Sequence, residues 1–195
     1  VDIYKANGIT PYFGGTLFEL FIIRGQFDEY QKFLEKFGID MSEVSDGSMY
    51  MKTEDKLNYI KELKKNFNVI SEVGSKDASV DIPTEKWIAM IKAELEAGSQ
   101  KVITEARESG TIGIYKSDGS ANKELIDTII KNFDINNIMW EAPHKPQQAM
   151  FIKMLGANVN LGNIATNEVI ALEALRMGFR GDTFFQFLPD NLKQK

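Results

Sequence analysis

Four glutamates close four separate β-like runs of the sequence, at Glu43, Glu72, Glu105 and Glu141. A carboxylate inside or just after an apolar run is costly to bury unless it is paired or ligates a cation. Carboxylate oxygens from several strands are suitable ligands for Mg²⁺, which retains several water ligands and often binds phosphorylated substrates. The glutamates therefore predict a shared metal site. The alternative is a set of ion pairs to Lys76, Arg107 and Lys145.

Lys76 and Arg107 are the cations best placed to act with these carboxylates. Lys76 follows a β-run and a Gly-Ser turn, and a dry pocket or nearby cations would lower its pKa and make it a proton donor. The competing interpretation is a solvated loop lysine. The guanidinium of Arg107 matches a phosphate or carboxylate bidentately, although a salt bridge to Glu105 or Glu108 explains it equally well.

Other polar positions follow the β-runs. His144 is the single histidine and is either a base or a surface residue. The turns Gly14-Gly15-Thr16 and Gly162-Asn163 offer backbone N–H groups to a phosphate. Ser109, Asn160 and Asn163 complete the anion-binding candidates, together with Gly15 and Thr16.

Six β-rich runs alternate with amphipathic helices and must position these residues. The expected strands are Pro11–Gly15, Met41–Asp46, Asn68–Gly74, Lys101–Arg107, Asn137–Pro143 and Asn158–Ile164. The expected helices are Phe27–Phe37, Thr53–Asn66, Thr84–Ala97, Asn122–Asn132, Pro146–Leu155 and Thr166–Met177. This alternation predicts βαβ units, a parallel sheet, and a site at the carboxyl ends of the strands.

Local signals refine the helix boundaries. Pro83 and Gly98 bracket one helix, and Thr53 is a candidate N-cap of another. The Asn-Gly pair that ends Val1–Gly8 is a helix C-cap signal, so the chain is expected to begin with the tail of a helix. No linker divides residues 1–195, which we expect to form one domain.

Composition limits the functional classes. The 195 residues are 43% hydrophobic and 26% charged, with a net charge of -5, which argues against a nucleic-acid-binding protein. The lack of cysteine excludes disulfides and thiolate sites in this chain. No apolar run is long enough to span a bilayer, and no signal peptide opens the chain. We therefore expect a soluble cytoplasmic protein without a membrane partner.

The polar strand ends resemble the phosphosulfolactate synthase family. The similar segments lie between about Val1 and Phe185 and are Gly14–Glu19, Glu43–Gly47, Ser71–Lys76, Glu105–Gly110, Glu141–Pro143, Val159–Ile164, Ala171–Arg176 and Arg180–Thr183. This resemblance implies a (β/α)₈ TIM barrel that adds sulfite to phosphoenolpyruvate with Mg²⁺, a step that starts coenzyme M synthesis in methane-forming archaea. It also implies a homo-oligomer.

The resemblance assigns roles to individual residues. It implies that Lys76 is the proton donor, that Glu72, Glu105 and Glu141 are carboxylates on the metal side, and that Arg107 contacts an anion. The family's Asp-Lys-Gly and Phe-Gly-Trp-Gly-Thr strands have no counterpart here, so we expect strands 3–8 only, with roughly sixty residues of the barrel absent. A catalytically silent relative and a phosphoenolpyruvate enzyme with another nucleophile remain as alternatives.

Overall fold

The structure is a computed structural model that describes residues 1–193. Six parallel strands form one curled sheet in chain order, as predicted. They are β1 (Tyr12–Gly14), β2 (Met41–Val44), β3 (Asn68–Val73), β4 (Lys101–Thr104), β5 (Ile138–Glu141) and β6 (Leu161–Gly162). Each strand pairs with the next one along the chain, as expected of consecutive right-handed βαβ units. The result is a curled half-barrel, consistent with part of a TIM barrel.

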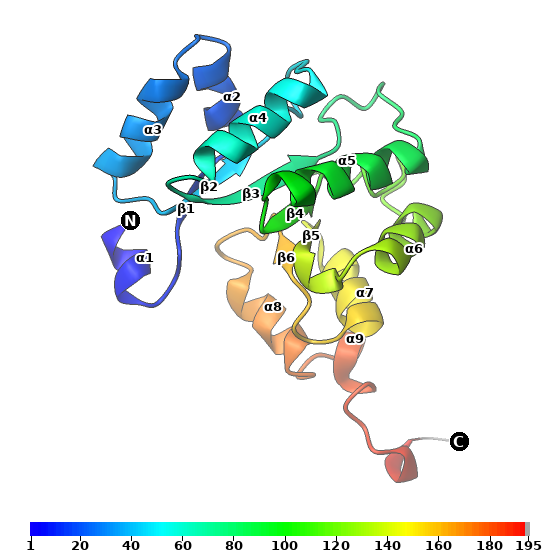
Figure 1. The fold of residues 1–195 in the computed structure, drawn as a ribbon. Coiled ribbons are helices and arrows are strands. Elements are labelled where there is room, and N and C mark those ends of the chain that lie inside the picture. The colour runs from blue at the N-terminus through cyan, green and yellow to red at the C-terminus, as the bar shows by residue number, and fades with distance from the viewer. Residues whose placement is uncertain (194–195) are drawn as a thin grey trace.

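Helices connect the strands and cover the outer side of the sheet (Figure 1). They are α1 (Asp2–Ala6), α2 (Thr16–Ile22), α3 (Phe27–Lys36), α4 (Thr53–Leu63), α5 (Thr84–Ala97), α6 (Lys123–Asn132), α7 (Lys145–Leu155), α8 (Val169–Arg176) and α9 (Gly181–Phe184), with short 3₁₀ turns at Ile135–Asn137 and Asp190–Leu192. Within residues 1–193, no helix combines the length and the apolar character needed to cross a bilayer.

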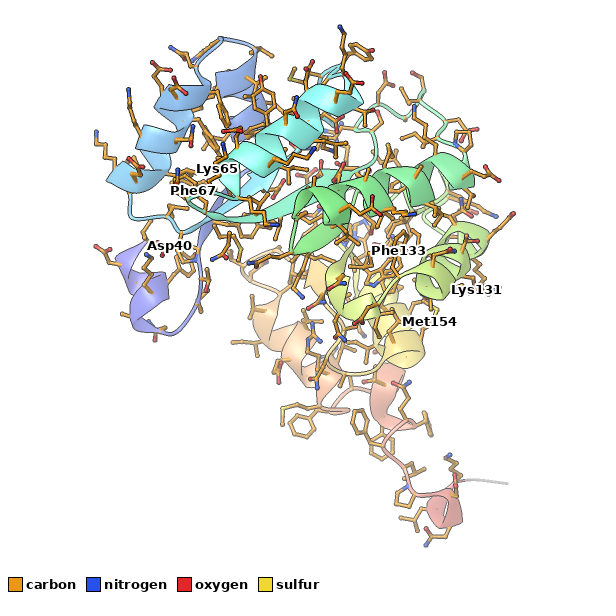
Figure 2. The ribbon with its side chains drawn as sticks, in the orientation of Figure 1. Asp40, Lys65, Phe67, Lys131, Phe133 and Met154 are labelled. Carbon is orange, nitrogen blue, oxygen red and sulfur yellow. The ribbon has the colours of Figure 1, made fainter. Side chains whose placement is uncertain are left out.

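Two apolar clusters fill the layer between the helices and the sheet. One joins α2, α3 and α4 to β2 and the start of β3, and includes Phe18, Tyr30 and Phe67. The other joins α5 to α8 with β4 and β5, and its largest buried side chains are Trp87 and Trp140. Figure 2 shows this layer, with Phe67 at the first cluster and Phe133 packed against the second.

Two boundary predictions need correction. Thr53 is the first residue of α4, and the N-cap is Lys52, whose side chain makes no capping hydrogen bond. The predicted strand at Asn158–Ile164 is paired only at Leu161–Gly162. In contrast, α5 begins and ends where Pro83 and Gly98 predict, and Gly98 adopts the left-handed conformation of a helix C-cap.

Candidate active site

The strand register places the four glutamates on one face of the sheet. Residues that pair across parallel strands share a face, and side chains alternate along each strand. Glu43 pairs with Ile70 and Glu72 pairs with Ile103. Ile103 pairs with Met139, and Glu105 and Glu141 each lie two residues further along. The opposite face supplies Val44, Val69, Val73, Val102, Ile138 and Trp140 to the cores under the helices. The glutamates therefore face away from the helices.

A polar cleft of about 550 Å³ opens at the carboxyl ends of the strands. Its lining residues are Tyr12, Thr16, Gly47, Ser48, Glu72, Lys76, Asp77, Glu105, Arg107, Glu108, Glu141 and Asn163. The cleft thus brings together seven of the predicted site residues, which come from the ends of β1, β3, β4, β5 and β6. This is the position at which parallel α/β folds bind ligands.

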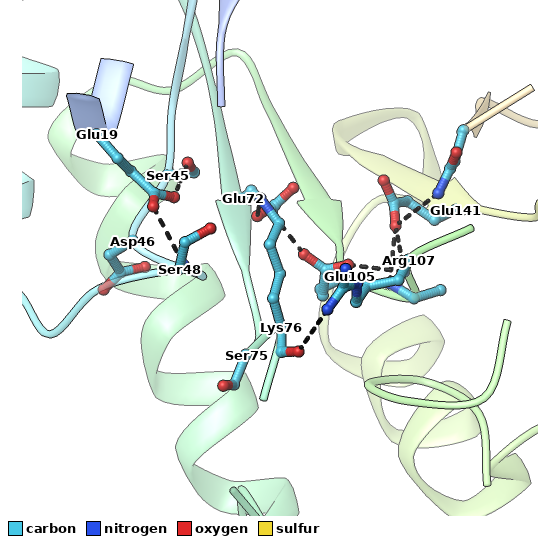
Figure 3. Close-up of polar contacts among 12 residues, drawn as sticks. Glu19, Ser45, Asp46, Ser48, Glu72, Ser75, Lys76, Glu105, Arg107 and Glu141 are labelled. Atoms are coloured by element: carbon cyan, nitrogen blue, oxygen red, sulfur yellow. Dashed lines mark hydrogen bonds and ion pairs between the residues drawn. The ribbon is translucent and has the colours of Figure 1, made fainter. Parts of the chain in front are cut away.

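Lys76 is the cation at the centre of the cleft (Figure 3). Its Nζ lies 3.3 Å from Glu72 Oε1 and 3.9 Å from Glu105 Oε2. Burial acts to lower the pKa of Lys76, but the charges of Glu72, Glu105 and Glu19 outweigh it and raise the pKa. The expectation of a lowered pKa was wrong, because the neighbours of this lysine are carboxylates instead of cations.

Arg107 joins the loop after β4 to two other strand ends. Its backbone N–H donates to Glu105 Oε1 at 2.7 Å and to Glu141 Oε2 at 3.2 Å. Its guanidinium donates to the carbonyl of Lys76 at 3.1 Å and is exposed at the cleft. The residue has a φ of 52°, an uncommon backbone conformation for a side chain of this size. Arg107 therefore offers a guanidinium that remains available to an anion.

The carboxylates in the cleft, and Glu43 on the same face of the sheet, hold protons more tightly than ordinary glutamates. Burial, followed by the charge of Glu105, raises the pKa of Glu72 to about 8. Burial and the charge of Glu72 raise the pKa of Glu43 to about 7 and that of Glu141 to about 7. Mutual repulsion therefore adds to desolvation, and a bound cation would relieve both.

The carboxylate oxygens of the cleft fit a metal cation that takes few ligands from the protein. Among residues 1–193, no cluster of three or more His, Cys, Asp or Glu is arranged to hold a metal ion. Glu72 Oε1 and Glu105 Oε2 are nevertheless buried and make no hydrogen bond, although both lie within ion-pair distance of Lys76 Nζ. Mg²⁺ uses one or two carboxylates and completes its shell with water and substrate oxygens. Glu72 and Glu105 meet that requirement.

Some predicted residues lie beside the cleft or away from it. Gly15 is at its edge, where an added Cβ would lie 2.8 Å from Glu43 Oε1. The backbone carbonyl of Ser109 contacts His144 Nε2 at 2.9 Å, and neither residue lines the cleft. Asn160 Nδ2 donates to the carbonyls of Asn136 and Ile138, near the amino end of β5. The structure therefore does not bring Ser109, His144 or Asn160 to the carboxylates.

The site region also contains residues that were not singled out from the sequence, among them Tyr12, Ser48 and Asp77 in the cleft lining and Glu19 behind it. Tyr12 lines the cleft, and burial together with the charges of Glu43, Glu141 and Glu72 raises its pKa to about 12. The pairing of Gly14 with Glu43 puts Tyr12 on the carboxylate face, but this register is not visible in the sequence. Glu19 accepts from Ser45 Oγ at 2.5 Å and from the backbone N–H of Ser48 at 3.2 Å, and it holds the loop after β2.

Comparisons with known proteins give a consistent result. The family model described as (2R)-phospho-3-sulfolactate synthase (ComA) matches residues 1–182. The chain is 44% identical over 188 residues to the phosphosulfolactate synthase of Bacillus subtilis (strain 168), covering 95% of this chain and 75% of that protein. It is 45% identical over 188 residues to the phosphosulfolactate synthase of Methanocaldococcus jannaschii, and the match covers 94% of this chain and 75% of that protein. For the phosphosulfolactate synthase of Methanothermobacter thermautotrophicus the identity is 39% over 187 residues, and the match covers 94% of this chain and 72% of that protein.

Proposed function

The chain belongs to the phosphosulfolactate synthase family, and on this premise we propose that it is a lyase-class enzyme that adds sulfite to phosphoenolpyruvate and forms (2R)-phospho-3-sulfolactate. The observation that supports this most directly is the Lys76 ammonium, which lies between Glu72 and Glu105 in a polar cleft beside the exposed guanidinium of Arg107. An acid and an anion contact are the two groups that this addition requires of the protein.

The reaction forms one carbon–sulfur bond and one carbon–hydrogen bond. The sulfur lone pair of sulfite attacks the methylene carbon of phosphoenolpyruvate. The electron pair of the double bond moves to the adjacent carbon, next to the carboxylate. Lys76 delivers a proton to that carbon and is then neutral until it regains a proton from solvent. Glu72 and Glu105 keep the lysine charged beforehand, because their charges raise its pKa.

The remaining residues of the cleft bind and orient. Arg107 is assigned to a substrate anion, because a guanidinium offers two parallel donors to a phosphate or carboxylate. Thr16 and Asn163 also line the cleft and would add polar contacts. Gly15 and Ser109 keep a proposed anion-binding role, which for Ser109 would require movement toward the cleft. Asn160 has no such role, because it lies near the amino end of β5.

Glu72 and Glu105 would hold Mg²⁺, with Glu141 as a further carboxylate on the same face. A bound metal would supply positive charge to the carboxylate of the substrate, where charge develops during the addition. The protein groups would keep their own tasks, since Lys76 provides the proton and Arg107 the anion contact.

We further propose that the six strands correspond to strands 3–8 of an eight-stranded barrel. The chain covers 75% of two relatives, and the carboxylates occupy the strand ends at which such barrels bind substrates. We also propose that the protein is a cytoplasmic homo-oligomer. Light scattering on the purified protein tests that assembly.

A direct assay tests the activity. The protein is incubated with phosphoenolpyruvate, sulfite and Mg²⁺, and the product is followed by ³¹P NMR and mass spectrometry. We expect phosphosulfolactate to form, and chelation of divalent ions to abolish its formation. Failure to form it under all conditions would identify a catalytically silent relative. Turnover of phosphoenolpyruvate without sulfite incorporation would indicate another nucleophile.

A further inference from the structure

Lys56 is a buried lysine on the side of the sheet opposite the cleft. It lies on α4 in the layer between helix and sheet, where it is 4% exposed. Its Nζ is 2.7 Å from Asp46 Oδ1, 2.7 Å from Glu94 Oε1 and 2.6 Å from the carbonyl oxygen of Glu72. An ammonium has three donors, and each of them has an acceptor here.

Stability alone does not explain this arrangement. Removing two charges from water costs several kcal/mol per ion, and apolar side chains of similar volume are often at least as stable as a buried ion pair. Burial acts to lower the pKa of Lys56, but the charges of Glu94 and Asp46 outweigh it, so the ammonium is retained. The position is better explained by what the ammonium holds in place.

The three acceptors belong to three different elements. Glu94 is on α5, Asp46 is in the loop after β2, and Glu72 is the cleft carboxylate on β3. The last paired residues of β2 and β3 are Val44 and Ser71, so Glu72 lies just beyond the ladder. Lys56 therefore holds the Glu72 backbone at the point where support from β2 ends.

The same loop also holds the proton donor. The backbone N–H of Lys76 donates to the carbonyl of Gly47 at 3.0 Å, one residue after Asp46. Lys56 thus fixes both ends of the segment Glu72–Lys76, at Glu72 directly and at Lys76 through the Asp46–Gly47 loop. These two anchors add to the pairing of Glu72 with Ile103 on β4 and to the hydrogen bond from the Arg107 guanidinium to the Lys76 carbonyl.

We propose that Lys56 is a positioning residue, which fixes the Glu72 backbone and the Asp46 loop and so sets the geometry of the Lys76 ammonium in the cleft. The consequence for catalysis rests on the function proposed above. Lys56 does not line the cleft, so it acts through Glu72 and Lys76 and not on the substrate.

The test removes the ammonium without leaving a buried charge behind. Lys56→Met alone would leave the charge of Glu94, which is 3% exposed, without a partner, so the variant is Lys56→Met with Glu94→Gln. Asp46 is 26% exposed in its side chain and can be hydrated. The control is Lys61→Met, an exposed lysine on the same helix. Asp46→Ala is a milder variant that removes one acceptor of Lys56 and leaves Lys56 paired with Glu94.

Two measurements are made on each folded variant. The first is kcat and KM in the phosphoenolpyruvate–sulfite reaction. We expect kcat to fall by about 10- to 100-fold in the double variant, with KM changing much less, because a displaced proton donor impairs the transition state more than binding. The second is backbone hydrogen exchange. We expect faster exchange at Glu72–Lys76 and in the loop after β2, with α6 and α7 unchanged.

The outcomes separate the inference from the proposed function. If the double variant has the same kcat and the same exchange pattern as Lys61→Met, the inference is overturned. Faster hydrogen exchange spread evenly over the sheet would also overturn it, because that pattern indicates a purely structural role for Lys56. If the unmodified protein makes no product, the proposed function fails, but hydrogen exchange still decides whether Lys56 positions Glu72 and Lys76, since it requires no turnover.

Discussion

Lys76 occupies the cleft as an ammonium among carboxylates, and this environment determines what it can do. Glu72 and Glu105 lie within ion-pair distance, while Glu43 and Glu141 share the same face. A raised pKa keeps the lysine protonated at neutral pH, which is the state that the proposed role of proton donor requires. Its proton becomes mobile only when a stronger base, such as the substrate carbon, forms beside it.

Substitution of Lys76 should separate catalysis from binding. We expect Lys76→Ala to lower kcat by about 10²–10⁴-fold with a smaller rise in KM for phosphoenolpyruvate, because a proton donor acts in the transition state. In Arg107→Ala, KM should rise at least as much as kcat falls, because an anion contact binds ground and transition states alike. Steady-state kinetics of both variants provide the check, and a near-normal kcat in Lys76→Ala would make Lys76 a loop or binding residue.

Glu141 should make the folded protein less stable as the pH rises. Its pKa is raised from 4.5 to about 7 by burial and by the charge of Glu72. The stability linked to its protonated form is therefore complete below about pH 4.5 and is lost as the pH rises through 7, by at most about 3–4 kcal/mol. Glu141→Gln keeps an oxygen for the amides of Ala106 and Arg107 and should lose less stability over this range.

Urea unfolding at pH 5 and pH 7.5 measures this difference in the absence of divalent ions. Glu62→Gln, on the exposed side of α4, is the control and should follow the unmodified protein. Identical pH profiles for Glu141→Gln and the unmodified protein would show that the buried carboxyl group does not destabilise the cleft.

The elements show how far the sequence determines the fold. The alternation of β-runs and amphipathic stretches predicted six parallel strands, and the Pro83 and Gly98 signals predicted both ends of α5. Helix α2 was missed, because its residues are almost all apolar and therefore show no helical periodicity.

Strand boundaries also decided which site residues could be predicted. Glu72, Lys76, Glu105 and Glu141 follow long or clear β-runs, so the strand-end rule placed them in the cleft. Asn160 was expected after a strand, but β6 begins at Leu161, so Asn160 lies at the opposite end of the sheet. Because β6 has only two residues, an error of three residues in its predicted start moves a residue from one end of the strand to the other. Tyr12 reaches the cleft through the pairing register of β1 with β2, which the sequence does not reveal.

The loop between β4 and α6 depends on a glycine that packs against the backbone of Glu105. Gly113 has a φ of 63°, and an added Cβ would lie 1.8 Å from the Glu105 carbonyl oxygen. Gly25 has a similar φ of 66° but nothing within 4 Å of an added Cβ. We expect Gly25→Ala to lower the free energy of unfolding by about 1–2 kcal/mol, and Gly113→Ala to lower it by more than about 4 kcal/mol. Equal losses in denaturant titrations would contradict this.

The whole molecule is a curled sheet whose two apolar clusters are divided near β3. Val69 belongs to the amino-terminal cluster and Val73 to the carboxyl-terminal one, so β3 connects both. The cleft lies across this division, with the loop after β2 on one side and Glu105, Arg107 and Glu141 on the other. The geometry of the site therefore depends on both clusters remaining packed on the same sheet.

The two clusters are also optically distinct. Both tryptophans, Trp87 at 2% and Trp140 at 0% exposure, lie in the carboxyl-terminal cluster, whereas the amino-terminal cluster contains only phenylalanine and tyrosine rings. Indole emission should therefore be blue-shifted in the folded protein and should report on one half of the sheet alone. If the halves unfold separately, the fluorescence transition will not coincide with the loss of helical circular dichroism. Coincident transitions would show that β3 couples them into one cooperative unit.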